Sequence, residues 1–250
     1  TKLRGHHLGE FQATFGHVAL DLLQGLGRIL HPEHGIVLLT TTEAMMPLLF
    51  CRPSPSSFID HHRRVCSMGR SCVLAVSGTP GAGKTRLCAE MALNGWKVLS
   101  LADLAREHGC LGSVDDEDGA APIDVHQLAD AWTPPSEGRW LVDGHLSHLL
   151  DLDGIVLLRC SPAVLEQRLF ERGYSADKVR ANVEWEMVAG HWSELMEFEI
   201  EYPLLELDAG AVSTSELVKR VSAWVEGGLD SPSPGGQANA AIDWLSETSD

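Results

Sequence analysis

The sequence predicts an α/β protein built on a five-stranded parallel sheet that is flanked by helices. Two observations lead to this prediction. A glycine-rich loop, GTPGAGKT at residues 78–85, stands between a short apolar run and a helical pattern, and four more apolar runs follow with helical patterns between most of them. Strands that alternate with helices favour a parallel sheet covered on both faces. The runs interpreted as strands are 72–76, 98–101, 140–142, 155–158 and 204–207.

Charge and composition divide the 250 residues into three parts. The chain has 19 Lys and Arg against 35 Asp and Glu, a net charge of −16. Residues 1–70 hold seven of these basic and five of these acidic residues, so the acidic excess arises after residue 70. We therefore expect an N-terminal extension of unknown function at 1–70 and a P-loop domain at 71–227. A tail at 228–250, rich in Gly, Ser and Pro, is expected to be disordered.

The same properties exclude several classes of function. A strongly acidic chain is a poor ligand for nucleic acid, which is bound mainly through Lys and Arg, so no direct DNA binding is expected and a basic protein partner fits better. The longest apolar stretch, 35–50, is interrupted and shorter than the ~20 residues of a membrane span. The six cysteines form no CxxC pair, and nothing at the start resembles a signal peptide. We expect a cytoplasmic protein.

The loop at 78–85 matches the phosphate-binding pattern G-x-x-x-x-G-K-[ST]. Gly78, Gly81 and Gly83 allow the backbone to curl so that successive N–H groups face an anion, and the N-terminus of the following helix adds partial positive charge. Lys84 would supply a charge for the β- and γ-phosphates of ATP, and the Thr85 hydroxyl would bind Mg²⁺. A glycine-rich turn without a ligand is the alternative interpretation.

Two further positions carry candidate chemistry. Asp143 ends an apolar run, where a carboxylate can hold Mg²⁺ in a P-loop protein, although an Asp-Gly pair at this place is also typical of a simple turn. His145 and His148 follow it and would lie within reach of the phosphates. Arg172 ends a helical pattern just before Gly173; it could reach over a triphosphate, or it could simply favour the helix C-terminus.

Taken together, these motifs resemble the adenylate kinase isoenzyme 6 family. The similarity covers about residues 72–227 and rests on VSGTPGAGKT, LSLADLAREHG, VDDEDGAAPID, LVDGHLSHLL and LEQRLFERGYSADKVRANVEWEM, in that order. The DGHLSHLL segment is more like the archaeal members. The resemblance implies a P-loop kinase fold with a short lid and a monophosphate-binding segment, and members that are nucleoside monophosphate kinases and ATPases tied to maturation of the small ribosomal subunit.

The resemblance also implies roles for individual residues. The ATP site would consist of Gly78, Gly81, Ala82, Gly83, Lys84, Thr85, Arg86 and Arg172. Arg86 departs from the family, which commonly has a second Thr there. Mg²⁺ would be held by Thr85 and Asp143. Segment 100–123, with Asp103 and Arg106, would bind the monophosphate, and 171–181 would form the lid. Lys84, Asp143, His145 and Arg172 would be the catalytic residues.

The implied function is transfer of the γ-phosphoryl group of ATP to AMP or a related nucleoside monophosphate, with associated ATPase activity because a short lid excludes water imperfectly. The alternative is an ATP-dependent assembly factor for the small ribosomal subunit that binds a basic ribosomal protein. A P-loop kinase of another small metabolite is a third interpretation. Consumption of AMP would distinguish the first from the second.

Overall fold

The computed structural model describes residues 71–113 and 121–247 of the chain. The expected N-terminal extension, the acidic run at 114–120 within the expected monophosphate-binding segment, and the last three residues lie outside the described residues. All described residues belong to one compact unit. No helix in the described part has the length and apolar character that crossing a membrane requires.

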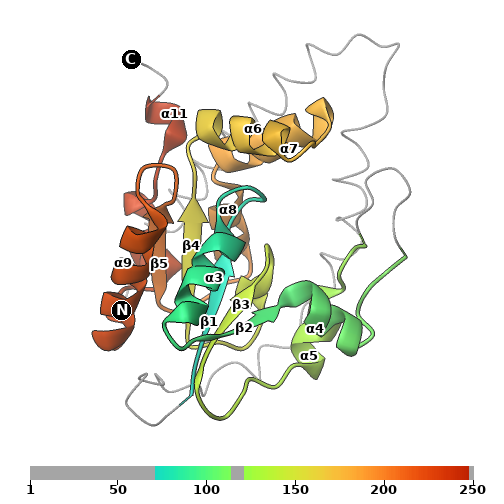
Figure 1. Ribbon diagram of the computed structural model, residues 1–250, viewed down its shortest axis with the longest axis vertical. Coiled ribbons are helices and arrows are strands. Elements are labelled where there is room, and N and C mark those ends of the chain that lie inside the picture. The colour runs from blue at the N-terminus through green and yellow to red at the C-terminus, as the bar shows by residue number, and fades with distance from the viewer. Residues whose placement is uncertain (1–70, 114–120, 248–250) are drawn as a thin grey trace, which may run out of the picture. The chain divides into compact units, whose positions relative to one another are not determined.

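A five-stranded parallel sheet forms the centre of the fold, as predicted (Figure 1). Its strands follow the order β2-β3-β1-β4-β5, and every neighbouring pair is parallel. The central strands β1 and β4 are buried along their whole length, which is why both appear in the sequence as continuous apolar runs. The bounds are β1 Cys72–Ser77, β2 Lys97–Ser100, β3 Arg139–Asp143, β4 Gly154–Arg159 and β5 Leu204–Asp208.

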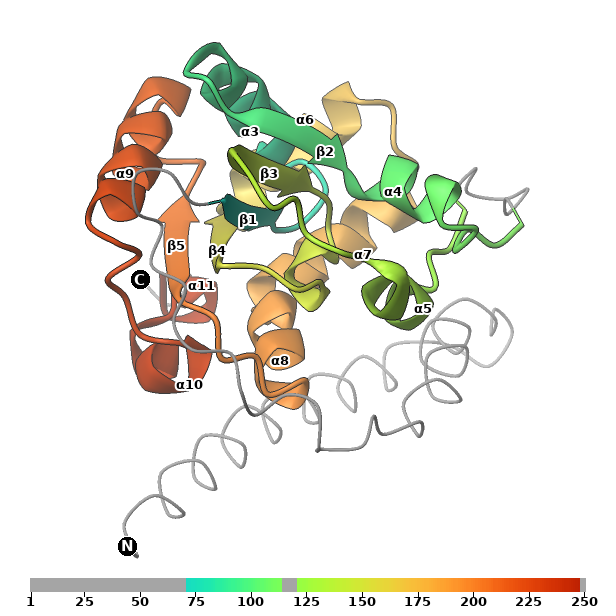
Figure 2. The same ribbon diagram turned by 90° about the horizontal axis from the view of Figure 1, so that it is seen from below.

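Helices cover both faces of the sheet (Figure 2). Helices α3 and α9 lie on one side and pack against each other, while α8 lies on the other side next to α7. Helices α6 and α7 lie beyond the carboxyl end of β4 (Figure 1). The bounds are α3 Lys84–Leu93, α4 Leu101–Glu107, α5 Val125–Ala131, η1 Ser147–Leu149, α6 Pro162–Glu171, α7 Ala176–Met187, α8 Gly190–Glu197, α9 Thr214–Glu226, α10 Pro234–Gln237, η2 Ala238–Ala240 and α11 Trp244–Glu247.

The ends of several helices follow directly from the sequence. Serine side chains cap α4, α7 and α9: the hydroxyls of Ser100, Ser175 and Ser213 accept from the backbone N–H three residues later. Helix α9 buries Leu217, Val221, Trp224 and Val225, a spacing that places one apolar face toward the core. Each such side chain contributes roughly 1.5–3 kcal/mol when fully buried.

The segment after residue 227 differs from the sequence expectation. We expected disorder over 228–250, but 228–247 is packed onto the domain and contains α10, η2 and α11. Trp244 is only 3% exposed, and its indole Nε1 donates to Glu186 Oε1 at 3.0 Å. The Gly, Ser and Pro content of residues 228–250 indicates only the local conformational preferences of the backbone, not the contacts that the segment makes with the domain. The buried Trp244 and hydrogen bonds of Gln237 and Ile242 to Leu204 and Glu206 supply tertiary contacts that order this segment despite its composition.

Candidate functional site

The glycine-rich loop joins the end of β1 to the start of α3. Gly78, Gly81 and Gly83 all have positive φ angles, of 137°, 94° and 113°. At Gly78 the tight approach also requires glycine, because an added Cβ would lie 2.2 Å from the carbonyl oxygen of Leu158 on β4. The loop ends at Gly83, the N-cap of α3, so the first-turn N–H groups of that helix face the loop. This is the geometry of an anion-binding loop.

Lys84 lies at the first position of α3 and folds back over the loop. Its Nζ donates to the carbonyl oxygens of Gly78 at 2.6 Å and Thr79 at 3.1 Å. Burial lowers the pKa of Lys84 to about 8, and the nearby Asp143 carboxylate opposes part of that change. The positive charge of Arg172 lowers the same pKa further. The Lys84 ammonium group is held by two carbonyl oxygens and has a second cation nearby. A polyanion bound there would be favoured by both positive charges.

Thr85 and Asp143 meet beside the loop. The Thr85 hydroxyl donates to Asp143 Oδ2 at 2.7 Å. The contact arises from the sheet: β3 runs parallel to β1 with Asp143 opposite Val76, so the last residue of β3 reaches the start of α3. A hydroxyl oxygen and a carboxylate oxygen brought together in this way form a donor set suited to Mg²⁺, which prefers oxygen ligands. The residues present therefore fit the ion that the loop implies.

Arg172 is the C-cap of α6 and is exposed. Its positive charge is near enough to Lys84 to lower the pKa of that ammonium group. Gly173 follows with a φ of 78°, the left-handed conformation that ends many helices. The structure thus shows Arg172 at the end of a helix, and its reach over a bound triphosphate stays a prediction.

His145 lies against the other side of the loop. Its carbonyl oxygen accepts from the Ser77 hydroxyl at 2.6 Å, and its ring meets the His191 ring edge-on with centroids 4.7 Å apart. Burial, followed by the neighbouring His191, lowers the pKa of His145 to about 4. The imidazole is therefore neutral near pH 7 and does not contribute a positive charge to the site.

The remaining predicted positions lie on α3 and α4. Arg86 lies on α3 directly after Thr85 and is exposed. Asp103 and Arg106 form an exposed ion pair with each other, with 63% and 65% of their side chains exposed. The start of α4 lies against the residue after Asp143, because an added Cβ at Gly144 would clash with Leu101. Asp103 and Arg106, which are predicted to bind the monophosphate, thus stand on a helix that begins beside Gly144.

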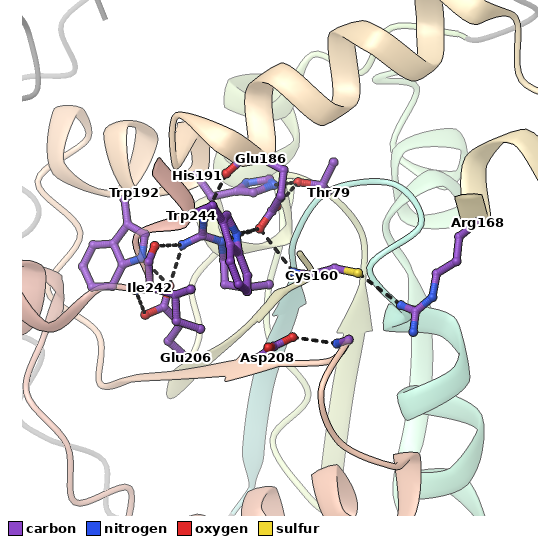
Figure 3. Close-up of polar contacts among 12 residues, drawn as sticks. Thr79, Cys160, Arg168, Glu186, His191, Trp192, Glu206, Asp208, Ile242 and Trp244 are labelled. Carbon is purple, nitrogen blue, oxygen red and sulfur yellow. Dashed lines mark hydrogen bonds and ion pairs between the residues drawn. The ribbon is translucent and has the colours of Figure 1, made fainter. Parts of the chain in front are cut away.

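Two residues that sequence reasoning missed contact the loop, Arg168 and Glu186, and Figure 3 shows Glu186 beside Thr79 and Arg168 beside Cys160. The guanidinium of Arg168, on α6, donates to the carbonyl oxygens of Gly81 at 3.4 Å, Ala82 at 3.3 Å and Ala209 at 3.1 Å. The buried Glu186 carboxylate, on α7, accepts from the Thr79 hydroxyl, Arg159 Nε and the Cys160 backbone N–H. Arg168 stands in the Arg-rich stretch that ends at Arg172, whereas Glu186 carries no local sequence signal.

Comparison with known proteins agrees with this geometry. A family profile described as an AAA domain matches residues 74–189, from β1 to the junction of α7 and α8, and so contains the loop, Asp143 and Arg172. A protein named "Putative adenylate kinase" from Archaeoglobus fulgidus is 38% identical over 181 residues, which cover 71% of this chain and 94% of the relative. The chain belongs to the adenylate kinase-like family. A relative of the same name from Thermococcus onnurineus is 37% identical over 177 residues, covering 70% and 92% of the two chains.

The family assignment confirms the α/β P-loop kinase fold and a nucleotide kinase-like function at the coarse level. Among solved structures, deoxyadenosine kinase from M. mycoides with bound dATP is 15% identical with a TM-score of 0.42, covering 62% of this chain and 99% of that chain. This likeness is too weak to support a conclusion about the acceptor. In this adenylate kinase-like protein the acceptor must be inferred from the site itself.

Proposed function

We propose that this protein transfers the γ-phosphoryl group of ATP to AMP or a related nucleoside monophosphate, with associated ATPase activity, and that it belongs to the isoenzyme 6 branch of its family and acts in the cytoplasm. The observation that carries the proposal is the contact between Thr85 and Asp143 beside Lys84. It brings the three groups that a Mg²⁺-nucleoside triphosphate requires to one end of β1.

The residues of the loop would perform most of the binding. The backbone N–H groups of residues 83–86 would surround the phosphates, and Lys84 would leave the carbonyls of Gly78 and Thr79 to bind phosphate oxygens. Mg²⁺, held through Thr85 and Asp143, supplies charge neutralisation and orients the phosphates when it is bound. Arg172 would add positive charge as the phosphoryl group moves. Positioning and charge carry the reaction, so no strong base is required.

Other residues would act on the attacking group, which is a water or the acceptor monophosphate. They are the neutral His145 and the exposed pair Asp103–Arg106. His145 would orient a water or an acceptor by hydrogen bonding, since its low pKa keeps it uncharged. Asp103 and Arg106 would part and bind the acceptor monophosphate, Arg106 through its phosphate. The lid formed by 171–181 is short, so water would reach the γ-phosphate in the absence of an acceptor.

The decisive experiment incubates the full chain with Mg-ATP and a panel of nucleoside monophosphates and measures both products. We expect ADP to form as AMP is consumed, together with a slower release of phosphate without AMP. Lys84→Ala should lower both rates by ~10²–10³, as removal of one transition-state donor does. Lys219→Ala, an exposed lysine on α9, is the matched control and should keep both rates. Unchanged rates in Lys84→Ala would contradict the proposal.

A second candidate function is an ATP-dependent assembly factor for the small ribosomal subunit. It is supported by the net charge of −16, which favours a basic partner such as a small-subunit ribosomal protein. The same assay separates the two: an assembly factor would hydrolyse ATP without consuming any monophosphate, and its ATPase rate would change when a basic ribosomal protein is added.

A further inference from the structure

Three buried side chains that are not part of the proposed phosphate site lie close together in the interior of the domain. His148 comes from η1, and His191 and Glu194 come from neighbouring turns of α8. His148 and His191 are each 1% exposed, and Glu194 is 8% exposed. One atom of each, His148 Nε2, His191 Nδ1 and Glu194 Oε2, forms a group in which all three lie within 4.8 Å of one another.

The hydrogen bonds of the two histidines fix which ring nitrogen carries the proton. The Ser77 hydroxyl donates to the carbonyl of His145, so its oxygen accepts from His148 Nδ1 at 2.9 Å. The Thr79 hydroxyl donates to Glu186, so its oxygen accepts from His191 Nε2 at 3.4 Å. In the neutral rings the other nitrogens, His148 Nε2 and His191 Nδ1, then carry lone pairs. Both of these nitrogens face Glu194.

With Glu194 ionised, three acceptor atoms thus converge in a buried space with no hydrogen between them, although burial raises the pKa of Glu194 and so also favours a proton there. Glu194 Oε2 lies 3.6 Å from His148 Nε2 and 3.3 Å from His191 Nδ1. Among the residues that the structure describes, none forms a hydrogen bond with any of these three atoms. Buried acceptors that face one another are unfavourable unless a positive charge lies between them. The arrangement therefore requires a metal ion or a proton between these three atoms.

The two separations from Glu194 Oε2, 3.6 Å and 3.3 Å, match those of neighbouring ligands around one metal ion, and the two histidine nitrogens lie within 4.8 Å of each other. Zinc binds imidazole nitrogen and carboxylate oxygen at about 2.0–2.2 Å in a tetrahedral arrangement, which places neighbouring ligand atoms roughly 3.3–3.6 Å apart. Two histidines and one glutamate are a common zinc ligand set with one position left open. Each histidine is also oriented by a hydrogen bond to its second nitrogen, as metal-binding histidines usually are.

We propose that His148, His191 and Glu194 form a buried binding site for Zn²⁺ or a similar borderline divalent metal, distinct from the Mg²⁺ site at Thr85 and Asp143. The two hydroxyls that orient the histidines belong to the end of β1 and to the phosphate loop. The metal would therefore fix the base of the loop against α8. Its role would be structural, because its ligands are buried away from the exposed Thr85 hydroxyl.

The test measures metal binding to the full chain after chelator treatment. Zn²⁺ is titrated by calorimetry, Co²⁺ is added as a spectroscopic probe, and thermal unfolding is followed with and without Zn²⁺. We expect tetrahedral Co²⁺ absorption bands, displaced by Zn²⁺, and a higher unfolding temperature with Zn²⁺. An octahedral Co²⁺ spectrum alone would indicate only the oxygen site at Thr85 and Asp143 and would overturn the proposal.

The chain has twelve histidines, so variants are needed to show which residues bind the Zn²⁺. Glu194→Gln keeps the shape of the side chain but removes its charge and should weaken Zn²⁺ binding at least ~100-fold, more than the loss of an outer partner does. His148→Gln should do the same and serves if the first variant does not fold. His108→Gln, an exposed histidine, is the control and should bind Zn²⁺ like the unmodified chain.

A proton on Glu194 in place of the metal ion would give different unfolding temperatures. If a proton on Glu194 is the only occupant, Glu194→Gln would keep the unfolding temperature of the metal-free protein, and neither the variant nor the unmodified chain would gain stability with Zn²⁺. Equal Zn²⁺ affinity in Glu194→Gln, His148→Gln and His108→Gln would equally overturn the proposal. Each result is independent of kinase activity, so this site and the proposed function can fail separately.

Discussion

Arg168 shows how a single side chain can set the direction of a phosphate loop. A peptide group is planar, with its N–H and C=O pointing to opposite sides. The Arg168 guanidinium holds the carbonyls of Gly81 and Ala82 on the outer side of the loop. Because the carbonyl of Ala82 points outward, the N–H of Gly83 in the same peptide group points toward the inside, where the phosphates would bind, whereas the N–H of Ala82 donates to the Thr79 carbonyl at 3.0 Å. Arg168 would therefore act on a nucleotide through the backbone without touching it.

We expect Arg168→Ala to weaken ATP binding by about tenfold. The lost hydrogen bonds to Gly81 and Ala82 are long, so their contribution is at the lower end of the range for charged donors, ~1.5 kcal/mol, and 1.4 kcal/mol corresponds to a factor of ten. Isothermal titration of Mg-ATP measures the change. Arg220→Ala is the matched control: Arg220 forms an exposed i,i+4 pair with Glu216 on α9 and should leave the affinity unchanged.

The contrast between Lys84 and Glu186 explains what the sequence could predict at the scale of residues. Lys84 and Thr85 belong to one continuous pattern, and Asp143 is the end of a readable strand, so these candidates could be named before the fold was known. Glu186 gains its importance from Thr79, which is 107 positions away in the chain. A carboxylate on a helix is normally solvent-exposed, and nothing in the neighbouring residues distinguishes this one.

The connection between β1 and α3 is the element on which the proposed nucleotide site depends. Of its three glycines with positive φ, Gly78 and Gly83 have very different surroundings. At Gly78 a Cβ would collide with the backbone of Leu158, whereas at Gly83 a Cβ would meet nothing within 4 Å. Gly78 is therefore required both by the φ angle and by the approach to β4. Gly83 is required by the φ angle alone.

Gly78→Ala should destabilise the protein clearly more than Gly83→Ala. Gly83→Ala adds a strained φ angle, ~1–3 kcal/mol, whereas Gly78→Ala adds similar strain and must also displace backbone. Urea unfolding measures both free energies. Gly235→Ala, where a Cβ would have open space and the structure gives no positive φ, serves as the control. Equal losses at positions 78 and 83 would show that the contact with Leu158 does not restrict the loop.

The strands were predicted more accurately than the C-terminal segment because only the strands carry a signal in their own residues. The buried strands β1 and β4 are recorded in their own residues as continuous apolar runs. Shorter apolar runs indicated β2, β3 and β5, which are only partly buried or, in the first half of β2, exposed. Helices α10 and α11 are four residues each, so they are too short to show periodicity. Their position is decided by contacts with Glu186, Glu206 and Leu204, which belong to other parts of the chain.

Over the whole molecule, the C-terminal segment is joined to the phosphate loop through one buried network. Trp244 donates to Glu186, and Glu186 accepts from Thr79 in the loop (Figure 3). Arg159 holds the network together, since its guanidinium donates to Glu186, to Glu206 at 2.7 Å and to the carbonyl of Ile242 at 3.1 Å. Because the charges of this buried group are paired, removing one member leaves the others without compensation.

Trp244→Ala should therefore lower the free energy of unfolding by ~3–5 kcal/mol, the range for loss of a buried aromatic side chain. The cost includes the cavity and the donor that Glu186 Oε1 loses, although Arg159 Nε and the Cys160 N–H still bind that oxygen. Urea unfolding followed by circular dichroism measures the change. Ser246→Ala, two residues further along α11 and exposed, is the control and should stay within ~0.5 kcal/mol. If Trp244→Ala is equally mild, the segment after residue 227 rests on the domain without stabilising it, and the network ends at Arg159.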